Sequence, residues 1–381
     1  MAARYMRSQR ARVAAMAGAV LIGAVVVSTV ALAINGRSGG GVAVASASAS
    51  TSASGTASDN ASQSASDIPS ELALGATATA AATPKVSAPA TGTHLPPFPT
   101  QTAGTTPVAT PPPQTVTIVA AGDIACDPGQ NVGAPQDCDQ AATAAQIGQL
   151  RPTAVLPLGD TQYENGTAAG YQKVYGPTWG QYKSISFPAI GNHEYLTSKA
   201  AGYFGYFNVP AYYSYDLGDW HMVSLDSECS QIGGCGAKSR QELWLLADLA
   251  AHPSLCTLVY WHEPRWSSGE HGDASQMTQI WSDLVAANVD VVLTGHNHDY
   301  ERFVPLNGTG KPDPLGTTEF VVGTGGKNHY GFTTAPLTGE VVRNDTSFGV
   351  IDMALGPTGY SWKFDPAPGY TFNDSGSAAC H

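Results

Sequence analysis

Residues 289–302 read Val-Asp-Val-Val-Leu-Thr-Gly-His-Asn-His-Asp-Tyr-Glu-Arg, an apolar run that passes directly into a polar loop. The β-branched run predicts a buried strand that ends at Thr294. His296 and His298 follow it two residues apart, and alternate residues of an extended segment point the same way. Both imidazoles can therefore reach one polar centre, an arrangement that suits a metal site.

Short apolar runs of the same kind recur along the rest of the chain. They predict strands at 116–121, 154–158, 185–190, 257–261, 289–294 and 320–322, with hairpin strands within 212–225 and 348–364. Helical patterns lie between some of them, at 139–150, 239–251 and 274–287. Alternating strands and helices predict an α/β fold, and two packed sheets flanked by helices would accommodate this number of strands.

Polar side chains follow five of the expected strands. A single Gly-Asp pair or histidine at such a position is usually a turn or a structural residue. Five such endings in one domain favour a shared site instead, because the C-terminal strand ends of α/β sheets converge on one crevice. The side chains brought together in this way would be Asp123, Asp160, Tyr163, Asn192, His262, His296 and His298.

Seven donors are more than one tetrahedral zinc ion requires, and they mix hard oxygen with borderline nitrogen ligands. Two metal ions that share a bridging carboxylate fit this set better. Such pairs lie about 3.5–4 Å apart and stabilise both the attacking and the leaving oxygen of a phosphoryl transfer. The strand ends therefore predict a binuclear site for phosphate chemistry.

This combination of motifs resembles the calcineurin-like metallophosphoesterases and, within them, the purple acid phosphatases, over essentially residues 115–365. Other members usually carry Asp-x-His in the first motif, where this chain has Ala125 in place of the histidine. Tyr163 stands three residues after Asp160, as in the purple acid phosphatase pattern, and residues 298–302 are similar too. The resemblance implies a four-layer sandwich of two mixed β-sheets flanked by helices, with the metal site at the strand C-terminal ends.

The resemblance also implies a role for each position. The first metal, Fe(III), would be held by Asp123, Asp160, Tyr163 and His298. Asp160 would bridge to a second metal, Zn, Mn or Fe(II), whose site is completed by Asn192, His262 and His296.

Two further histidines have roles under the same resemblance. His193 would contact the phosphate together with Asn192, or support proton transfer. The family also places a catalytic histidine nine residues after the His262 position, and His271 stands there as the expected acid for the leaving group. The next position can also be histidine in the family, and in this chain it is Gly272.

The function implied is that of an exported phosphoesterase in which metal-bound hydroxide attacks phosphorus in line and hydrolyses phosphate monoesters, as in acid phosphatases. A phosphodiesterase or nucleotide hydrolase on the same site is an alternative, since nothing in the sequence defines the alcohol side of the substrate. A non-catalytic surface-binding protein is a further alternative. Tyr300 is a candidate wall of the substrate pocket.

The N-terminal residues 1–35 are predicted to be a signal peptide or a membrane anchor. Four arginines precede an apolar, uncharged run at 13–34, and Ala31-Leu32-Ala33 fits a signal cleavage pattern. The run is also long enough to span a bilayer with its N-terminus in the cytoplasm. Either form places the folded part outside the cell, secreted or anchored to the outer face of the cell membrane.

Residues 36–114 are almost entirely Ser, Ala, Thr, Gly and Pro, a composition typical of a disordered linker. The remaining 267 residues, 115–381, suffice for one metallophosphoesterase domain. This part holds 27 of the 30 acidic and 12 of the 18 basic residues, a net charge of −15. Such a surface argues against nucleic acid as a partner but is compatible with a small phosphate ester, because bound cations reverse the local field.

All six cysteines lie in this domain, and an even number in an exported protein suggests disulfides. Pairs Cys126–Cys138 and Cys229–Cys235 would close short loops and leave Cys256 with Cys380, one of fifteen possible pairings. A zinc–cysteine cluster is the alternative, although no Cys-x-x-Cys occurs.

Overall fold

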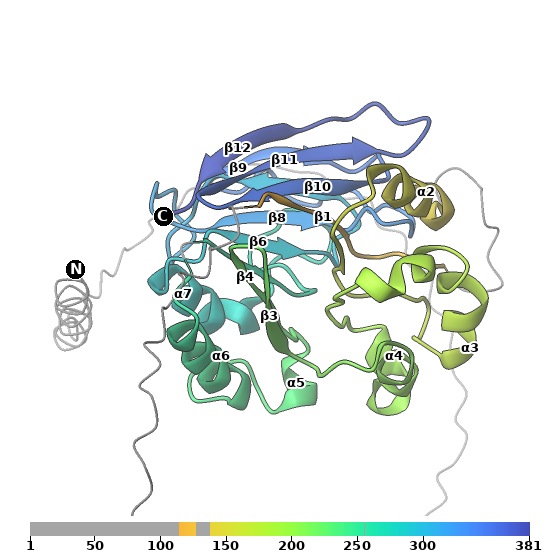
Figure 1. Ribbon diagram of the computed structural model, residues 1–381, viewed down its shortest axis with the longest axis horizontal. Helices are drawn as coiled ribbons and strands as arrows, with labels where there is room; N and C mark the ends of the chain where they lie inside the picture. Colours follow the sequence, from red (N-terminus) through yellow and green to blue (C-terminus); the bar gives the residue numbers. More distant parts are fainter. Residues whose placement is uncertain (1–113, 127–137, 255) are drawn as a thin grey trace, which may run out of the picture. The chain divides into compact units, whose positions relative to one another are not determined.

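Two β-sheets packed against each other form the centre of the protein in the computed structural model, which describes residues 114–126, 138–254 and 256–381 (Figure 1). The five-stranded sheet has the order β12-β11-β10-β1-β2, and the seven-stranded sheet has the order β3-β4-β5-β6-β8-β7-β9. The strands of the first sheet are β1 (Val116–Ala121), β2 (Ala154–Pro157), β10 (Gly349–Gly356), β11 (Gly359–Pro366) and β12 (Ser375–Ala379). Those of the second are β3 (Tyr213–Leu217), β4 (Trp220–Ser224), β5 (Cys256–Tyr260), β6 (Val291–Thr294), β7 (Tyr300–Phe303), β8 (Thr318–Val322) and β9 (Glu340–Asn344).

Both sheets are mixed. β1 and β2 run parallel, as do β4, β5, β6 and β8, whereas the other neighbours pair antiparallel. Parallel strands need a long crossover, and helices provide it for three of the four pairs: α2 (Gln140–Leu150), α6 (Arg240–Ala251) and α7 (Thr278–Ala286), whereas β7 lies on the crossover from β6 to β8. Each crossover returns the chain to the start of the next strand, so the C-terminal ends of the parallel strands lie at one edge.

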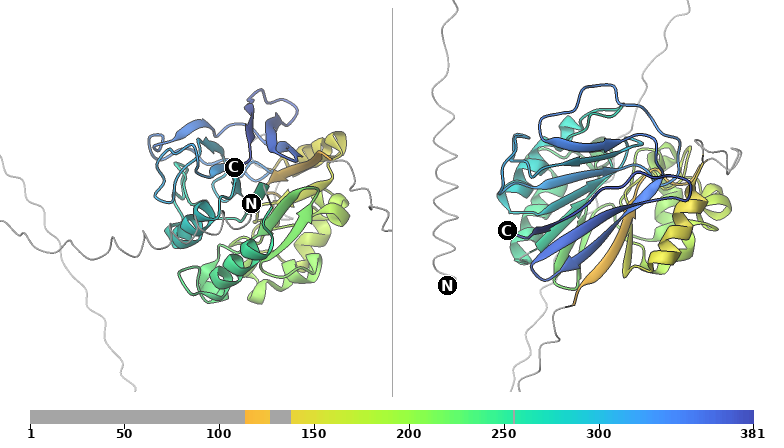
Figure 2. Two further views of the ribbon diagram at one scale, coloured as in Figure 1. Left: turned by 60° about the vertical axis from the view of Figure 1, so that its left-hand side comes forward. Right: turned by 90° about the horizontal axis from the view of Figure 1, so that it is seen from above.

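The other helical segments are short and connect strands at the periphery. They comprise α3 (Ala168–Gly170), η1 (Tyr171–Tyr175), η2 (Trp179–Ile185), η3 (Glu194–Leu196), η4 (Ser198–Ala200), α4 (Ala201–Phe207), α5 (Cys229–Ile232) and η5 (Ser275–Met277). Figure 2 shows helices on both sides of the stacked strands. The predicted α/β fold of two mixed sheets flanked by helices is therefore confirmed.

The core has two apolar layers because the central strands are buried on both faces. Along β4, Trp220 and Met222 pack into the cluster between the sheets, whereas Val223 packs into the cluster beneath the helices. β5 repeats this alternation, with Leu258 between the sheets and Val259 on the helix side. The two-residue period of a strand thus explains why these segments read as continuous apolar runs.

One predicted strand is wrong. Residues 185–190 make only isolated bridges to the edge of β2, at Ser186 and Ala189, and form no ladder. Pro188 stands between these two positions and has no N–H to donate, which interrupts the hydrogen bonding that a strand requires. The other strands and the three long helices lie at or near their expected positions, although α7 begins only at Thr278, after the 3-10 turn η5.

The three predicted disulfides are confirmed. Bonds join Cys126 to Cys138, Cys229 to Cys235 and Cys256 to Cys380. The last of these spans 124 positions and ties the first residue of β5 to the segment that follows β12. The predictions of a signal or anchor at 1–35 and of a linker at 36–114 lie outside the described residues, apart from residue 114. Among the helices of the described part, none has the length and apolarity needed to cross a bilayer.

Candidate metal centre

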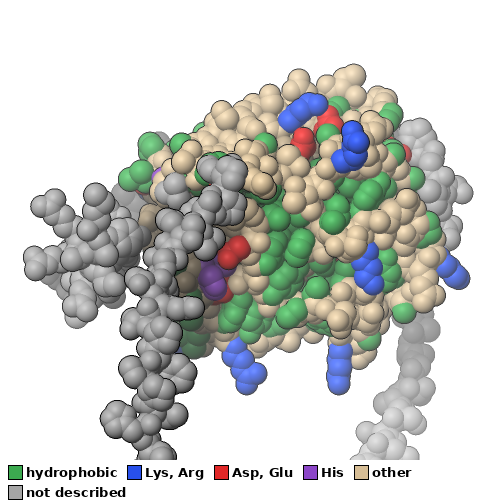
Figure 3. Space-filling model, viewed as in Figure 1, with side chains coloured by type: hydrophobic (Ala, Val, Ile, Leu, Met, Phe, Trp, Pro, Cys, Tyr) green, Lys and Arg blue, Asp and Glu red, His purple; other side chains and the backbone are tan. Residues whose placement is uncertain are grey.

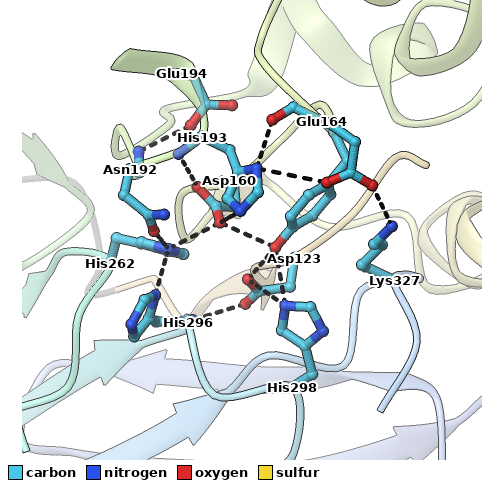
Figure 4. Close-up of polar contacts among 12 residues, drawn as sticks. Asp123, Asp160, Glu164, Asn192, His193, Glu194, His262, His296, His298 and Lys327 are labelled. Atoms are coloured by element: carbon cyan, nitrogen blue, oxygen red, sulfur yellow. Dashed lines mark hydrogen bonds and ion pairs between the residues drawn. The ribbon is translucent and has the colours of Figure 1, made fainter. Parts of the chain in front are cut away.

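The strand ends deliver all seven predicted donor residues to one place, and Figure 4 labels all of them except Tyr163. Asp123 follows β1, Asp160 follows β2, His262 follows β5, and His296 and His298 follow β6. Three of these residues have left-handed backbones, with φ of 59° at Asp123, 43° at Asp160 and 68° at His296. Such conformations are unfavourable for non-glycine residues and concentrate at functional sites, where the surrounding structure holds them in place.

The first group of donors surrounds the phenol of Tyr163. Its Oη lies 2.7 Å from Asp123 Oδ1, 2.9 Å from Asp160 Oδ2 and 2.9 Å from His298 Nε2. His298 Nε2 is also 3.3 Å from Asp123 Oδ1. Donors that bind one ion at about 2.0–2.2 Å are themselves about 3 Å apart, so these separations fit a shared cation.

The second group of donors surrounds His262 Nε2. This atom lies 3.2 Å from Asp160 Oδ2, 3.1 Å from Asn192 Oδ1 and 3.3 Å from His296 Nδ1. Ligand atoms of Asp160, His262 and His296 all lie within 4.8 Å of one another. Asp160 belongs to both groups, and its carboxylate therefore occupies the position of a bridge.

Backbone carbonyls orient the imidazoles toward the centre. His262 Nδ1 donates to the carbonyl of Leu158 at 2.8 Å, and His298 Nδ1 donates to that of Asn328. A carbonyl can only accept, so Nδ1 carries a proton and Nε2 is the atom that faces the other donors, the usual outer-shell arrangement of metal-binding histidines. Gly159 is required beside His262, since it has a φ of +82° and a Cβ there would lie 2.4 Å from Nδ1.

A buried glutamate joins the two central loops. The carboxylate of Glu194 accepts hydrogen bonds from the backbone N–H of Thr161 and of Gly191, both at 2.9 Å. It thereby links the loop after Asp160 to the loop that contains Asn192. Burial, and then the neighbouring charge of Asp160, raise the pKa of Glu194 to about 7.

The electrostatics of the site favour a cation. Burial alone would raise the pKa of Asp160, but the imidazoles of His262 and His193 outweigh it and hold this pKa well below its ordinary value. Burial, followed by the repulsion of His262, lowers the pKa of His296 to about 3, so its ring is neutral and its lone pair is free. Burial and the charges of Asp123 and Asp160 raise the pKa of Tyr163, whose phenol keeps its proton unless a cation replaces it.

The two predicted catalytic histidines lie on the accessible side of these donors. The backbone N–H of His193 donates to Asp160 Oδ1 at 2.9 Å, and its Nε2 lies 3.9 Å from Asp160 Oδ2. His271 is exposed, with its ring 4.6 Å from that of His296. Asn297 holds the His271 loop, since its Oδ1 accepts from the backbone N–H of His271 at 2.8 Å.

The prediction that Tyr300 lines the substrate pocket is wrong. Its side chain is fully buried at the start of β7, and its hydroxyl donates to Asp374 Oδ2 at 2.7 Å. The ring packs against Phe364 and Phe372, with centroids 4.9 and 5.4 Å away. His298 belongs to the loop before β7, whereas Tyr300 is the first residue of that strand, so the two side chains take different directions.

Sequence reasoning missed two residues beside the donors, Lys327 and Tyr330. Lys327 is buried and donates to Glu164 Oε1 at 2.7 Å, with its ammonium 5.0 Å from the centre of the Tyr163 ring (Figure 4). Tyr330 stacks on His298 at 4.1 Å between centroids. A signal was present for Lys327 and Tyr330, because the Gly-rich polar segment 323–330 follows β8 just as the other donor loops follow their strands.

Comparison with known proteins relates this architecture to a family. Residues 116–300 match the model of the calcineurin-like phosphoesterases. The chain is similar to purple acid phosphatase 18 of Arabidopsis thaliana, with 34% identity over 125 residues, or 31% of this chain and 28% of that protein. This chain thus spans less than a third of the length of that relative.

Two solved structures share the fold. A purple acid phosphatase from yellow lupin seeds has a TM-score of 0.55 and 18% identity, over 70% of this chain and 54% of that one. GAP50, described as the anchor in the inner membrane complex of Plasmodium, also has a TM-score of 0.55, with 14% identity over 70% of this chain and 89% of that one. The resemblance to calcineurin-like phosphoesterases of the purple acid phosphatase type is confirmed.

Proposed function

We propose that this chain, whose residues 116–300 match the calcineurin-like phosphoesterases and which is similar to the purple acid phosphatases, hydrolyses phosphate monoesters at a binuclear metal centre. The observation that carries the proposal is the position of Asp160, whose carboxylate lies 2.9 Å from the Tyr163 phenol and 3.2 Å from His262. A carboxylate with a donor group on either side is suited to bridge two cations.

The two groups of donors differ in chemistry, and we therefore expect them to hold different metals. Tyr163, Asp123, Asp160 and His298 offer three anionic oxygens once the phenol loses its proton, which suits a trivalent ion such as Fe(III). Asp160, Asn192, His262 and His296 offer neutral imidazoles and an amide, which suit Zn, Mn or Fe(II). Bound there, the two ions would acidify a water molecule and offset the charge of the phosphoryl group.

The side chains of the protein provide the remaining functions. Asn192 and His193 stand next to the bridging carboxylate, where they would hold the phosphoryl oxygens in line for displacement. His271 lies on the solvent side of His296, where it would protonate the departing alcohol. Burial, and then the nearby His298, lower the pKa of His271, which makes its protonated form a stronger acid.

We infer export from two supporting features. The three disulfides are typical of proteins that fold in an oxidising compartment. The apolar run at 13–34 is suited to a signal peptide or an outward-facing anchor. A phosphoesterase outside the cell would act on small phosphate esters that diffuse to it.

A shared fold does not by itself imply catalysis, because the fold also occurs in the Plasmodium anchor protein. The set of seven donors favours an enzyme here, since a binding scaffold has no need to keep three buried ionisable groups, Tyr163, His262 and His298, within 3.3 Å of a carboxylate.

The test is hydrolysis of matched monoester and diester substrates by the purified chain, combined with His271→Ala. We expect the monoester to be the better substrate. Loss of the general acid should lower kcat about 10²-fold or more for alkyl phosphates, whose leaving groups are poor, and change it little for nitrophenyl phosphate. Equal losses for both leaving groups would contradict the role of His271, and faster diester hydrolysis would contradict the monoester assignment.

His381→Ala is the matched control for this experiment. It removes a partly exposed histidine at the C-terminus, whose Nδ1 lies 2.9 Å from Asp290 and whose backbone N–H keeps a bond to the same carboxylate. We expect its rates on all these substrates to equal those of the wild type.

A further inference from the structure

We propose that His221, Asp248 and His252 form a second cation site, separate from the centre at the strand ends. Ligand atoms of these three residues lie within 4.8 Å of one another. The site would take a divalent transition-metal ion, and its effect would be to fasten helix α6 to the edge of the seven-stranded sheet. This proposal is independent of the phosphoesterase function.

The fold brings the three residues together from two elements. His221 lies on β4 and faces the same side as Val223, which packs beneath the helix layer. Asp248 and His252 stand four residues apart at the C-terminal end of α6, so both lie on one face of the helix. This face meets the strand at His221, where Nε2 lies 2.9 Å from Asp248 Oδ2.

The neighbouring edge strand supplies the outer partners. Asp216 and Ser214 of β3 pair with His221 and Val223 of β4, and their side chains therefore point to the same side. Asp216 Oδ1 lies 2.9 Å from His221 Nδ1, and Ser214 Oγ donates to Asp248 Oδ1 at 2.7 Å. Asp216 accepts from Nδ1 and so holds the ring with Nε2 toward Asp248, where a cation would replace the proton of the Nε2 hydrogen bond and complete the carboxylate–histidine–metal arrangement.

His252 lies at the mouth of this site. Its side chain is 43% exposed, and its Nδ1 lies 3.4 Å from Asp248 Oδ1. The ring stacks on that of His221 at 4.5 Å between centroids. Figure 3 shows a histidine flanked by acidic side chains on this face, in the region of β3 and α6. A cation can therefore enter from solvent, and His252 would exchange its Nδ1 hydrogen bond to the Asp248 carbonyl for the metal.

The ligand set selects the class of ion. Two imidazoles and one carboxylate suit Zn²⁺ or a similar transition metal, whereas Mg²⁺ and Ca²⁺ prefer oxygen donors alone. Three protein donors with water as the fourth would give tetrahedral coordination, in which donors about 2.1 Å from the ion are about 3.4 Å apart. The separations of 2.9 and 3.4 Å from the two Asp248 oxygens are near this value, and the His252 ring, which stacks at 13° to that of His221, would turn to direct its Nδ1 at the same ion.

The site is distinct from the catalytic centre. His221 pairs with Thr257 of β5. His262 lies five residues after Thr257, just beyond the end of that strand. At about 3.3 Å per strand residue, the two positions are about 16 Å apart. A metal at one site is therefore not shared with the other.

The test compares zinc binding by the full chain and by its His252→Gln variant. Glutamine can still donate to the Asp248 carbonyl but provides no imidazole, so the helix end keeps its hydrogen bond. We expect the wild type to bind one zinc equivalent more than the variant, or to bind that equivalent at least tenfold more tightly, in competition with a chromophoric chelator. Zinc should also raise the thermal midpoint of the wild type more than that of the variant.

The wild type and His252→Gln both keep the strand-end centre and its metals. Only the difference in zinc binding between the two proteins therefore reports on the new site. His381→Gln is the control for the loss of a histidine elsewhere, and it should bind as much zinc as the wild type. Equal zinc content, equal affinity and equal thermal shifts in wild type and His252→Gln would overturn the proposal. His221 would then serve only as a hydrogen-bonded link between Asp216 and Asp248.

Discussion

Replacing Asp160 by Asn should lower kcat/KM for a phosphate monoester by about 10³-fold or more and reduce the content of both metals. The carboxylate lies in contact with donors of both groups, at 2.9 Å from Tyr163 Oη and 3.2 Å from His262 Nε2. An amide has nearly the same shape, but it carries no charge, and its neutral oxygen is a much weaker bridge between two cations than the Oδ2 of Asp160. The measurements are steady-state kinetics and elemental analysis of the purified variant.

Asp219→Asn is the matched control, since this exposed carboxylate lies in the turn between β3 and β4. It should keep the metal content and activity of the wild type. If Asp160→Asn lost only one metal and kept most of its activity, Asp160 would be a ligand of a single ion, and the binuclear arrangement would be refuted.

Removing the bond between Cys256 and Cys380 should lower the free energy of unfolding by about 5 kcal/mol. The two cysteines are 124 positions apart, and the entropy that a cross-link removes from the unfolded chain grows with the length of the closed loop. A loss of this size is comparable to the whole stability of many domains, about 5–15 kcal/mol. Denaturant unfolding of the Cys256→Ser, Cys380→Ser double variant measures it.

The Cys229→Ser, Cys235→Ser double variant gives the comparison. These cysteines are only 6 positions apart, and the same relation predicts a loss of about 2 kcal/mol. Equal losses for the two double variants would contradict the loop-length argument and indicate that local packing determines the effect.

The donor set could be predicted from sequence because its signal is local. Each donor residue stands directly after, or within a few residues of, a short apolar run, and the parallel pairing of those runs brings their ends to one edge. Residues 185–190 show the limit of this reasoning. Pro188 prevents them from forming a strand, yet the chain still runs beside β2 and delivers Asn192 correctly.

Other features depend on tertiary packing that no local pattern contains. Tyr300 belongs to the same motif as His298, but the pleat of β7 directs it toward Phe364 and Asp374, on strands and loops far away in sequence. His271 stands on a loop without regular spacing, and its position near His296 depends on Asn297. Only the family resemblance indicated it in advance.

Metal analysis combined with a visible absorption spectrum tests the central claim most directly. The proposal predicts that the purified protein contains iron and a second metal, and that it absorbs visible light through charge transfer from the Tyr163 phenolate to Fe(III). Tyr163→Phe removes only the hydroxyl that lies 2.7 Å from Asp123 and 2.9 Å from Asp160, and it should abolish the band. A wild-type protein without iron or without the band, or a band that persists in Tyr163→Phe, would contradict the proposal.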